Sequence, residues 1–584
     1  MKIRALRALN TVALVLASTT FGPLASAADE KPTSSQTQSA EFAELKAQLA
    51  QQQQQIEQLR KTLEEQKKLL EGAIKASDAG AAQAASAPVE RTKPFDVGQV
   101  ASTTPVIPAG LALKPTALPS VMPTGMPTTA AAQAPAADAP SPLQIHIGEA
   151  TITPVGFMDL TNTFRSTNAG TSLQTNFGSI PYNNTIPGRL TEDKFSAANS
   201  RIGFRVDAKW HDTNIMGYYE GDFVGGVAGN NTQVSSNSLL YRIRLYWVDA
   251  RKGQFEVLAG QSWSMMTPNR KAISALPADL FYSQVVDVNY MNGLTWGRIP
   301  GIRFLYHPTD KITFGLSLEN AAQYFGGSGG GGTPTLPAAL SSATVDLRNN
   351  ELDASVANGV AIANVHPDII AKLAFDPSSR VHFEFVGVER TVRLFNPLQP
   401  PNPGAQQHFT KAGGGGSVNG NFEIVKNFRL ITNNYWSDGG GRYLFGIAPD
   451  FIVRADGSPS LIHSGSTLDG FEATLKNTAI YGYYGGVYIG RNTALDANGT
   501  SLIGYGYRGS PNSQNKTTQE ASVGLTQTLF RDSKYGALQI MLQYAYLFRD
   551  PWYVAPGAPK NTHEHAIWFN LRYLLPGSAP TIKY

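Results

Sequence analysis

One ten-residue stretch decides the fold class: Arg201-Ile202-Gly203-Phe204-Arg205-Val206-Asp207-Ala208-Lys209-Trp210. Its even-numbered residues are apolar, and its odd-numbered residues are charged or glycine. Because successive side chains point to opposite faces of a β-strand, this period of two predicts a strand with one apolar and one polar face. A short charged segment, His211-Asp212, follows directly and predicts that the chain reverses there.

The same pattern extends from about residue 150 almost to the end of the chain. Seven connections are tight and charged: Trp210–Thr213, Arg251–Gln254, His307–Lys311, Asp376–Arg380, Val425–Asn427, Lys476–Asn477 and Arg531–Lys534. Eight others alternate with them and are long and rich in Gly, Asn, Ser and Pro. Fifteen connections join sixteen strands, and short turns at one rim with long loops at the other are typical of bacterial membrane barrels. We therefore predict an all-β membrane barrel of sixteen antiparallel strands in residues 143–584.

Other segments indicate which face each strand presents. Leu538–Phe548 sets apolar residues against Gln539, Met541 and Gln543, and Ile567–Tyr573 sets them against Trp568, Asn570 and Arg572. In another strand we expect one face to carry Tyr241, Ile243, Leu245 and Trp247, and the other to carry Arg242, Arg244 and Tyr246. The first strand, near Thr151–Phe164, cannot be oriented, because Phe157, Met158 and Leu160 disagree in phase.

Alternation alone fits two folds. A soluble sandwich turns its polar faces outward, whereas a membrane barrel turns them toward the lumen. Three features favour the barrel: an N-terminal secretion signal, strands of roughly the nine to eleven residues needed to span at a tilt, and aromatic residues confined to this region, with no Trp or Tyr before Tyr182. Sixteen strands leave an aqueous channel rather than a filled interior.

The N-terminal 142 residues divide into three segments. Residues 1–27 are predicted to be a signal peptide, with Lys2, Arg4 and Arg7 before an apolar stretch and Ala25-Ser26-Ala27 as the cleavage site. Residues 38–75 carry a heptad repeat and predict a periplasmic α-helical coiled coil. An isolated solvated helix is the alternative, and the heptad does not separate dimer from trimer. Residues 76–142 are predicted to form an Ala/Pro-rich disordered linker, with eleven prolines from Pro88 to Pro142.

Composition excludes several classes of function. The net charge of the 584-residue chain is +4, which gives no strong attraction to nucleic acid. There is no cysteine, and the nine histidines form no zinc pattern, so we expect no metal and no cofactor. We expect no catalytic residue, because no convincing Ser/His or Asp/His pair is found for the outer rim. Gly326-Gly327-Ser328-Gly329-Gly330 matches a nucleophile-elbow pattern on paper, but it lies in a glycine run and is expected to be a surface loop.

Six short motifs follow one another along the predicted strands: Asn199-Ser200-Arg201-Ile202-Gly203-Phe204, Tyr219-Glu220-Gly221-Asp222-Phe223, Arg242-Ile243-Arg244, Leu258-Ala259-Gly260-Gln261-Ser262-Trp263, Tyr483-Tyr484-Gly485-Gly486-Val487-Tyr488 and Asn570-Leu571-Arg572-Tyr573. Together they resemble the motifs of DcaP-like trimeric outer-membrane porins. Each motif is weak alone, and their order carries the resemblance, which covers roughly residues 38–75 and 150–575. It implies sixteen strands, a homotrimer, a third loop folded into the lumen and passive uptake of small, often anionic solutes. The chain departs from the pattern at its end, where Pro576–Tyr584 follow the last strand.

The third long loop, Ser264–Arg298, is the candidate constriction. We expect it to fold inward, because it carries much apolar surface. The candidate pore-lining residues are Arg270, Lys271, Asp279 and Asp287 on the loop and Arg201, Arg205, Arg242, Arg244, Arg303, Glu220 and Asp222 on the wall. An arginine wall opposite an acidic loop would create a transverse field that attracts anions. The alternative is that the arginines pair with the interleaved acids and stiffen the lumen.

These observations lead to one functional expectation. The chain is predicted to be a homotrimeric outer-membrane porin, not an enzyme, with a water-filled channel for small hydrophilic solutes and its N-terminal region in the periplasm. Its expected partners are further copies of itself, outer-membrane lipid and lipopolysaccharide, and peptidoglycan as a candidate contact of the coiled coil. Two alternatives stay open: an envelope-tethering structural barrel and an outer-membrane barrel hydrolase.

Overall fold

The computed structural model describes residues 141–168, 173–225, 239–327, 331–341, 345–346, 351–352, 365–395 and 408–576. The predicted signal peptide, coiled coil and nearly all of the linker lie outside these residues. Among the residues described, no helix is long and apolar enough to cross a membrane.

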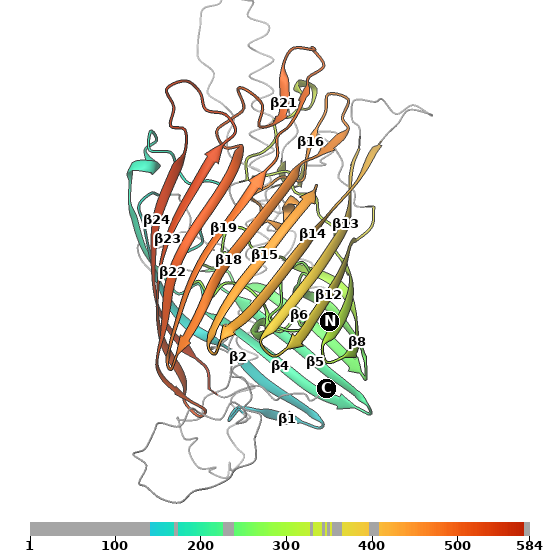
Figure 1. Cartoon of the computed structure of the whole chain (residues 1–584), viewed down its shortest axis with the longest axis vertical. Helices are drawn as coiled ribbons and strands as arrows, with labels where there is room; N and C mark the ends of the chain where they lie inside the picture. The colour runs from blue at the N-terminus through green and yellow to red at the C-terminus, as the bar shows by residue number, and fades with distance from the viewer. Residues whose placement is uncertain are drawn as a thin grey trace, which may run out of the picture. The chain divides into compact units, whose positions relative to one another are not determined.

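Sixteen long antiparallel strands close into a barrel (Figure 1), as the turn pattern predicts. The barrel strands, in chain order, are β2 (Ala150–Arg165), β4 (Arg201–Trp210), β5 (Thr213–Asp222), β6 (Arg242–Lys252), β7 (Phe255–Trp263), β8 (Arg298–Thr309), β9 (Ile312–Glu319), β12 (Asp368–Ser378), β13 (Val381–Phe395), β14 (His408–Val425), β15 (Phe428–Asp438), β18 (His463–Leu475), β19 (Thr478–Ile489), β22 (Asn515–Asp532), β23 (Gly536–Pro551) and β24 (Thr562–Leu574). Each pairs with the next, and β24 pairs with β2 in the register Phe157↔Leu574 to Arg165↔Ala566. No barrel strand is therefore left with an unpaired edge.

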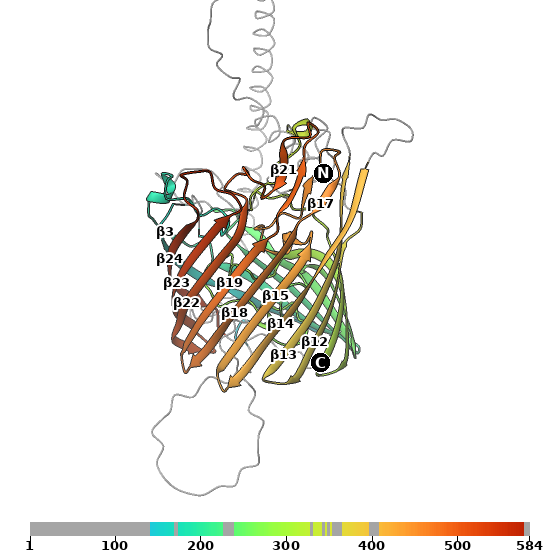
Figure 2. The ribbon, with the colours of Figure 1, turned by 45° about the horizontal axis from the view of Figure 1, so that its top comes forward.

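Short strands and 3-10 turns are found beside the barrel strands and in the long connections. Two of the strands extend the sheet beside β2: β1 (Ile145–Ile147) and β3 (Glu192–Ser196). The others lie in long connections and are β10 (Val345–Asp346), β11 (Glu351–Leu352), β16 (Phe451–Val453), β17 (Pro459–Leu461), β20 (Asn492–Leu495), β21 (Leu502–Tyr505) and the 3-10 turns η1 (Pro187–Arg189), η2 (Pro277–Asp279), η3 (Ala338–Leu340) and η4 (Gly441–Tyr443). Figure 2 shows β17 and β21 gathered at the barrel end that carries the long connections.

All seven tight connections are turns between neighbouring strands, at the positions the sequence predicts. Three of them place a residue other than glycine in the left-handed region: His211 (φ 52°), Asn427 (φ 67°) and Lys476 (φ 55°). Short hairpin turns need positive φ because their backbone twist must match that of the flanking strands. The strain at these residues is a consequence of joining long strands through so few residues.

The two faces of the wall differ as a membrane barrel requires. On β23 the outward Leu542 is 44% exposed, whereas its inward neighbour Gln543 is 1% exposed. The same alternation holds in β24 and in β4, where Ile202 and Phe204 face outward and Arg201 faces inward. The phases predicted for these three strands are confirmed.

The phase predicted for Tyr241–Trp247 is wrong beyond Ile243. A β-bulge shifts the register, so that Gly221 pairs with Ile243 while Glu220 pairs with Leu245. Arg244 and Leu245 are both fully buried, and Tyr246 is 65% exposed on the outer face. A bulge inserts one extra residue into a strand, so every later side chain changes face.

Strand β2, which the sequence left unoriented, keeps one phase throughout. Val155, Phe157 and Asp159 point inward, and Met158 and Leu160 point outward. Phe157 obscures the alternation in the sequence, because it is an apolar residue on the otherwise polar inner face. Its ring lies under the guanidinium groups of Arg572 and Arg201, 4.1 Å and 5.1 Å away, so it is part of a polar wall through cation–π contact.

Candidate functional site

The loop between β7 and β8, residues 264–297, lies inside the barrel. Its backbone N–H groups donate hydrogen bonds to inward-facing side chains of six strands: Met265 to Glu319 on β9 (2.8 Å), Asn269 to Glu384 on β13 (2.9 Å), Gln284 to Tyr483 on β19 (3.0 Å), Val286 to Gln543 on β23 (3.0 Å), Asn292 to Glu520 on β22 (2.9 Å) and Thr295 to Asn433 on β15 (3.0 Å). A loop with such contacts on several sides crosses the lumen. The wall side chains satisfy loop N–H groups that would otherwise be buried without partners.

Glycine allows the loop backbone to lie directly on the wall. Gly485 on β19 faces inward, and a Cβ there would overlap the carbonyl oxygen of Asn292. Gly293, with φ of 88°, would meet the carbonyl oxygen of Thr467 in the same way. Any side chain at either glycine would push the loop off this part of the wall.

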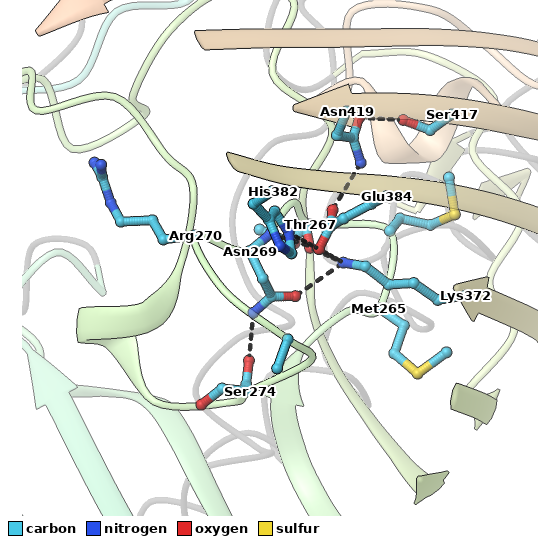
Figure 3. Close-up of polar contacts among 12 residues, drawn as sticks. Met265, Thr267, Asn269, Arg270, Ser274, Lys372, His382, Glu384, Ser417 and Asn419 are labelled. Atoms are coloured by element: carbon cyan, nitrogen blue, oxygen red, sulfur yellow. Dashed lines mark hydrogen bonds and ion pairs between the residues drawn. The ribbon is translucent and has the colours of Figure 1, made fainter. Parts of the chain in front are cut away.

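One anchor holds the start of the loop to β12 and β13 (Figure 3). The Lys372 ammonium lies 2.8 Å from the Glu384 carboxylate and donates to the Thr267 carbonyl oxygen (3.0 Å) and to Asn269 Oδ1 (2.8 Å). Asn419 on β14 donates to the other oxygen of Glu384 (2.9 Å). Each charge in this buried network has hydrogen-bond partners, as a buried ion pair requires.

A histidine extends the anchor toward the rim with the tight turns. His382 Nδ1 lies 2.9 Å from Asp376, and His382 Nε2 lies 3.3 Å from Glu384. The second Asp376 oxygen accepts the backbone N–H of Ala272 (3.0 Å). The loop base therefore contacts a continuous chain of acidic and basic groups.

A second anchor lies on β18, which is separated from β13 by β14 and β15. The Arg270 guanidinium donates two hydrogen bonds of 2.9 Å to the two oxygens of Glu472 on β18. Tyr483 donates to the same carboxylate (2.8 Å), and Asn421 on β14 donates to the Arg270 carbonyl oxygen (3.2 Å). Because two parallel hydrogen bonds join the planar guanidinium and carboxylate groups, they fix the orientation of the Arg270 side chain as well as its distance from Glu472.

The arginines of β6 pair with the acids of β5. Arg244 donates to Glu220 (2.7 Å) and to Asp222 (2.7 Å), and Arg242 donates to Asp222 (2.7 Å). The third contact of Arg244 is with the loop, through the hydroxyl of Tyr290 (2.7 Å). Arg244 is fully buried, whereas the Arg242 side chain is 33% exposed.

The other three arginines predicted for the wall are buried on the inner face: Arg201, Arg205 and Arg303. Arg201 lies 3.6 Å from Glu220, and Arg205 pairs with Asp207 on its own strand (2.8 Å). Arg303 on β8 donates to the Trp263 carbonyl oxygen (2.5 Å). The structure therefore brings Arg201, Arg242 and Arg244 into one cluster with both predicted wall acids.

The charged loop residues are spread along the loop. Lys271 is exposed, and Asp279 accepts a hydrogen bond from the Ser274 hydroxyl (2.8 Å). Asp287 is buried against another long connection and accepts hydrogen bonds from the N–H groups of Asn289 (2.8 Å) and Thr175 (3.5 Å). Burial raises the pKa of Asp287 to about 6, and the hydrogen bonds from Thr175 and Asn289 act in the opposite direction.

Aromatic side chains pack where this loop meets the β15–β18 connection. Trp263 stacks on Tyr282, with ring centroids 5.7 Å apart, and Tyr290 meets Trp296 edge to face at 5.2 Å. Trp296 in turn stacks on Phe445 at 4.9 Å. The buried core of the molecule thus lies within the barrel, built from loop residues and from inward wall residues.

Sequence reasoning missed the wall partners of the loop, chiefly Lys372, Glu384 and Glu472. Each occupies an inward position of its strand, and alternation could have marked Lys372 as luminal, because the outward positions of β12 are apolar. The signal is weaker for Glu384 and Glu472, because the outward positions of β13 and β18 include the charged residues Glu389 and Asp469. Alternation could not pair them with a loop more than 100 residues away. Among the residues described, no group of three or more His, Asp or Glu could hold a metal ion.

Comparisons with known proteins concern the fold. No protein-family model and no curated protein matches the chain. The outer-membrane channel DcaP of Acinetobacter baumannii is similar in structure, with a TM-score of 0.52 and 15% identity over 73% of this chain and 97% of that chain. OmpT of Vibrio cholerae gives a TM-score of 0.37 at 8% identity (74% and 99% covered), and OmpF of Salmonella typhi gives 0.36 at 8% (74% and 100% covered).

The similarity to DcaP confirms the resemblance to DcaP-like porins at the level of the fold. At 15% identity it shows a shared barrel and nothing about individual site residues. The OmpT and OmpF similarities are weaker and carry no argument.

Proposed function

We propose that this chain is an outer-membrane channel of the porin type, through which small hydrophilic solutes diffuse. The observation that carries the proposal is the closed barrel with apolar side chains outside and charged side chains inside. Exposed leucine, phenylalanine and tyrosine rows suit acyl chains, and hydrogen-bonded polar rows suit water. The loop across the lumen would set the width of the passage.

We further propose that the passing solutes are anions. The support is the cluster of Arg201, Arg242 and Arg244, in which three guanidinium groups face the two carboxylates Glu220 and Asp222. One positive charge is left over at this part of the wall, and Arg242 is partly exposed. Excess fixed positive charge in a narrow, low-dielectric passage raises the local concentration of anions.

The assembly we propose is a homotrimer in the outer membrane, in contact with lipid and lipopolysaccharide. The heptad in residues 38–75 would associate with its copies on the periplasmic side, and the outward apolar wall would be covered by lipid and by neighbouring subunits. Chemical crosslinking of the full chain in its native membrane tests the subunit number directly.

One observation favours a second candidate, an envelope-tethering barrel that does not conduct. Every residue of the loop from Leu280 to Trp296 is buried, and residues of other long connections pack against this segment. A lumen filled in this way would leave a structural role for the barrel. The hydrolase alternative has less support. An Asp/His pair, Asp438 and His463 (3.4 Å), does lie where β15 and β18 meet their long connection, but His463 stacks on Trp436, which points away from the lumen.

Planar-bilayer recording on the purified full chain separates these candidates. A porin gives stepwise currents, in groups of three for a trimer, and a tether gives none. Reversal potentials in a salt gradient then test the ion preference. An anion preference that decreases in the Arg242→Ser/Arg244→Ser variant supports the charge argument, and a cation preference unchanged by the same variant contradicts it.

A further inference from the structure

The outward face of the wall carries a groove across strands β14, β15, β18, β19 and β22, which lie side by side (Figure 1). On β15 the lining residue Trp436 is 56% exposed, whereas its inward neighbour Tyr435 is buried. The same alternation separates Tyr484 from Tyr483 on β19, so the groove opens away from the lumen. Its volume of about 580 Å³ lies within the range of sites that bind small molecules, about 300–1,000 Å³.

A glycine leaves the centre of the groove open. Gly486 on β19 faces outward between Thr467 on β18 and Gln519 on β22. An added Cβ at Gly486 would lie 3.4 Å from its nearest neighbour, an ordinary van der Waals distance, so none of the described side chains fills the space above this glycine. The outward side chains of Tyr484 and Tyr488, two residues away on either side, also line the groove.

Polar groups line the groove although it faces the lipid side of the wall. Gln519 Oε1 accepts a hydrogen bond from the Tyr484 hydroxyl (3.0 Å). The Gln519 amide nitrogen and the Thr517 hydroxyl have no hydrogen-bond partner among the described residues. Acyl chains supply no partners, and a polar group without one is costly in a hydrocarbon environment. The lining therefore indicates an occupant that carries hydrogen-bonding groups of its own.

Two cations lie at the end of the groove nearer the long connections. Tyr488, which lines the groove, meets Trp552 edge to face at 6.1 Å. The Arg491 Cζ atom lies 4.6 Å from the Trp552 ring centroid, and the Lys516 Nζ atom lies 5.6 Å from it. None of the described carboxylates forms an ion pair with either cation, although Asp550 is close enough to Lys516 to interact electrostatically. Two positive charges against one negative charge leave this end of the groove basic.

The position of this basic end suits a lipid headgroup. Arg491 lies two residues beyond the end of β19, and Lys516 is the second residue of β22. Long connections are extracellular in bacterial outer-membrane barrels, and tryptophan and tyrosine mark the level of the headgroups. Arginine forks toward phosphate oxygens, and lysine binds phosphate as a point charge. A phosphate group of the outer leaflet would therefore meet both cations.

We propose that the groove, with Arg491 and Lys516, binds one molecule of the phosphorylated glycolipid of the outer leaflet, the lipid A part of lipopolysaccharide. Its phosphate binds the two cations beside Trp552, and its sugar and acyl linkages lie in the groove over Gly486. The glycolipid brings hydroxyl, amide and ester groups that can pair with the polar lining, whereas acyl chains cannot. The outer-leaflet location rests on the proposed function, but binding itself does not require conduction, so the two statements can fail separately.

The test uses lipid A as the probe on the full chain purified in detergent, and native mass spectrometry to count the bound molecules. Lipid A should bind saturably, and phosphatidylglycerol should bind about tenfold more weakly because it has no sugar for the polar lining. Arg491→Ser/Lys516→Ser should weaken lipid A binding by about tenfold or more, because both phosphate partners are lost. The matched control is Lys252→Ser/Lys534→Ser, which removes two exposed lysines from the rim with the tight turns and should change the affinity less than about twofold.

A second pair of variants tests the groove. Gly486→Leu should weaken lipid A binding by about tenfold or more, because the added side chain occupies the groove. Gly387→Leu is its control: it adds the same side chain to the outward face of β13, where an added Cβ meets nothing within 4 Å, and β13 is separated from β19 by β14, β15 and β18. Inorganic phosphate should not displace lipid A, because it makes no contact with the groove.

Each outcome decides the inference. The absence of saturable lipid A binding, equal affinities in the two double-serine variants, or equal affinities for lipid A and phosphatidylglycerol overturns it. Displacement by phosphate with an unchanged affinity in Gly486→Leu assigns the cations to free phosphate and rejects the lipid. If Gly486→Leu does not fold, the double-serine comparison decides. Conduction in planar bilayers without lipid A binding rejects the site and leaves the channel, whereas lipid A binding without conduction supports the site and rejects the channel.

Discussion

The ion pair between Arg270 and Glu472 should decide how firmly the loop stays in the lumen. Both side chains are buried, with 4% and 8% of their surfaces exposed, and they share two hydrogen bonds of 2.9 Å. Removing one partner of a buried pair costs about 3–5 kcal/mol, because the other charge stays buried. Tyr483 still donates to Glu472, so we expect Arg270→Met to cost about 3 kcal/mol of loop attachment. That is roughly a hundredfold increase in the fraction of open loop.

The absence of cysteine from the chain provides the assay. A single cysteine can replace Ser283, which is 3% exposed and whose hydroxyl has no hydrogen-bond partner among the described residues. A water-soluble maleimide labels this thiol only when the loop leaves the wall, so the labelling rate follows the open fraction. We expect labelling to be about a hundredfold faster in the Arg270→Met background.

The neighbouring Lys271 supplies the control, because it is exposed. Lys271→Met also removes a positive charge from the loop, and we expect its labelling rate to stay within a factor of about three of the unaltered chain. Adding Glu472→Gln to Arg270→Met should recover part of the loss, because no buried charge is then left unpaired. Equal rates in Arg270→Met and Lys271→Met would refute the assignment of Arg270 as an anchor.

Three further predictions concern the wall and the loop. Leu525→Arg, on the outward face, should lower the free energy of unfolding in lipid vesicles by about 2–4 kcal/mol, and the inward neighbour Thr526→Arg by much less; equal losses would contradict the assignment of faces. Because the folded pKa of Asp287 is raised to about 6, its contribution to stability is present at low pH and is lost as the pH rises through 6. Asp287→Asn should therefore be more stable than the unaltered chain at pH 7 by up to about 3 kcal/mol and not at pH 3.5, as measured by urea unfolding, and a difference independent of pH would count against this. Gly485→Ala should speed the cysteine labelling described above, whereas Gly387→Ala, where an added Cβ meets nothing within 4 Å, should not.

The barrel could be predicted almost completely from the sequence, and the site only in part. The loop was identified by its length, its apolar residues and its place between two strands, and its start and end agree with Trp263 and Arg298. Its partners could not be found, because Arg270 and Glu472 are 202 residues apart and no local pattern links them.

Sequence alone determined the number of strands, the alternation of tight turns with long loops, and the faces of regular strands such as β4, β23 and β24. These properties are local, since a period of two and a turn of two to five residues are set by neighbouring residues. The tertiary structure alone decided the bulge at Arg244, the joining of Arg244 with Glu220, Asp222 and the loop, and the two anchors that hold the loop. Those depend on register and on distances between strands, because a shift of one residue moves a side chain from the lipid side to the lumen.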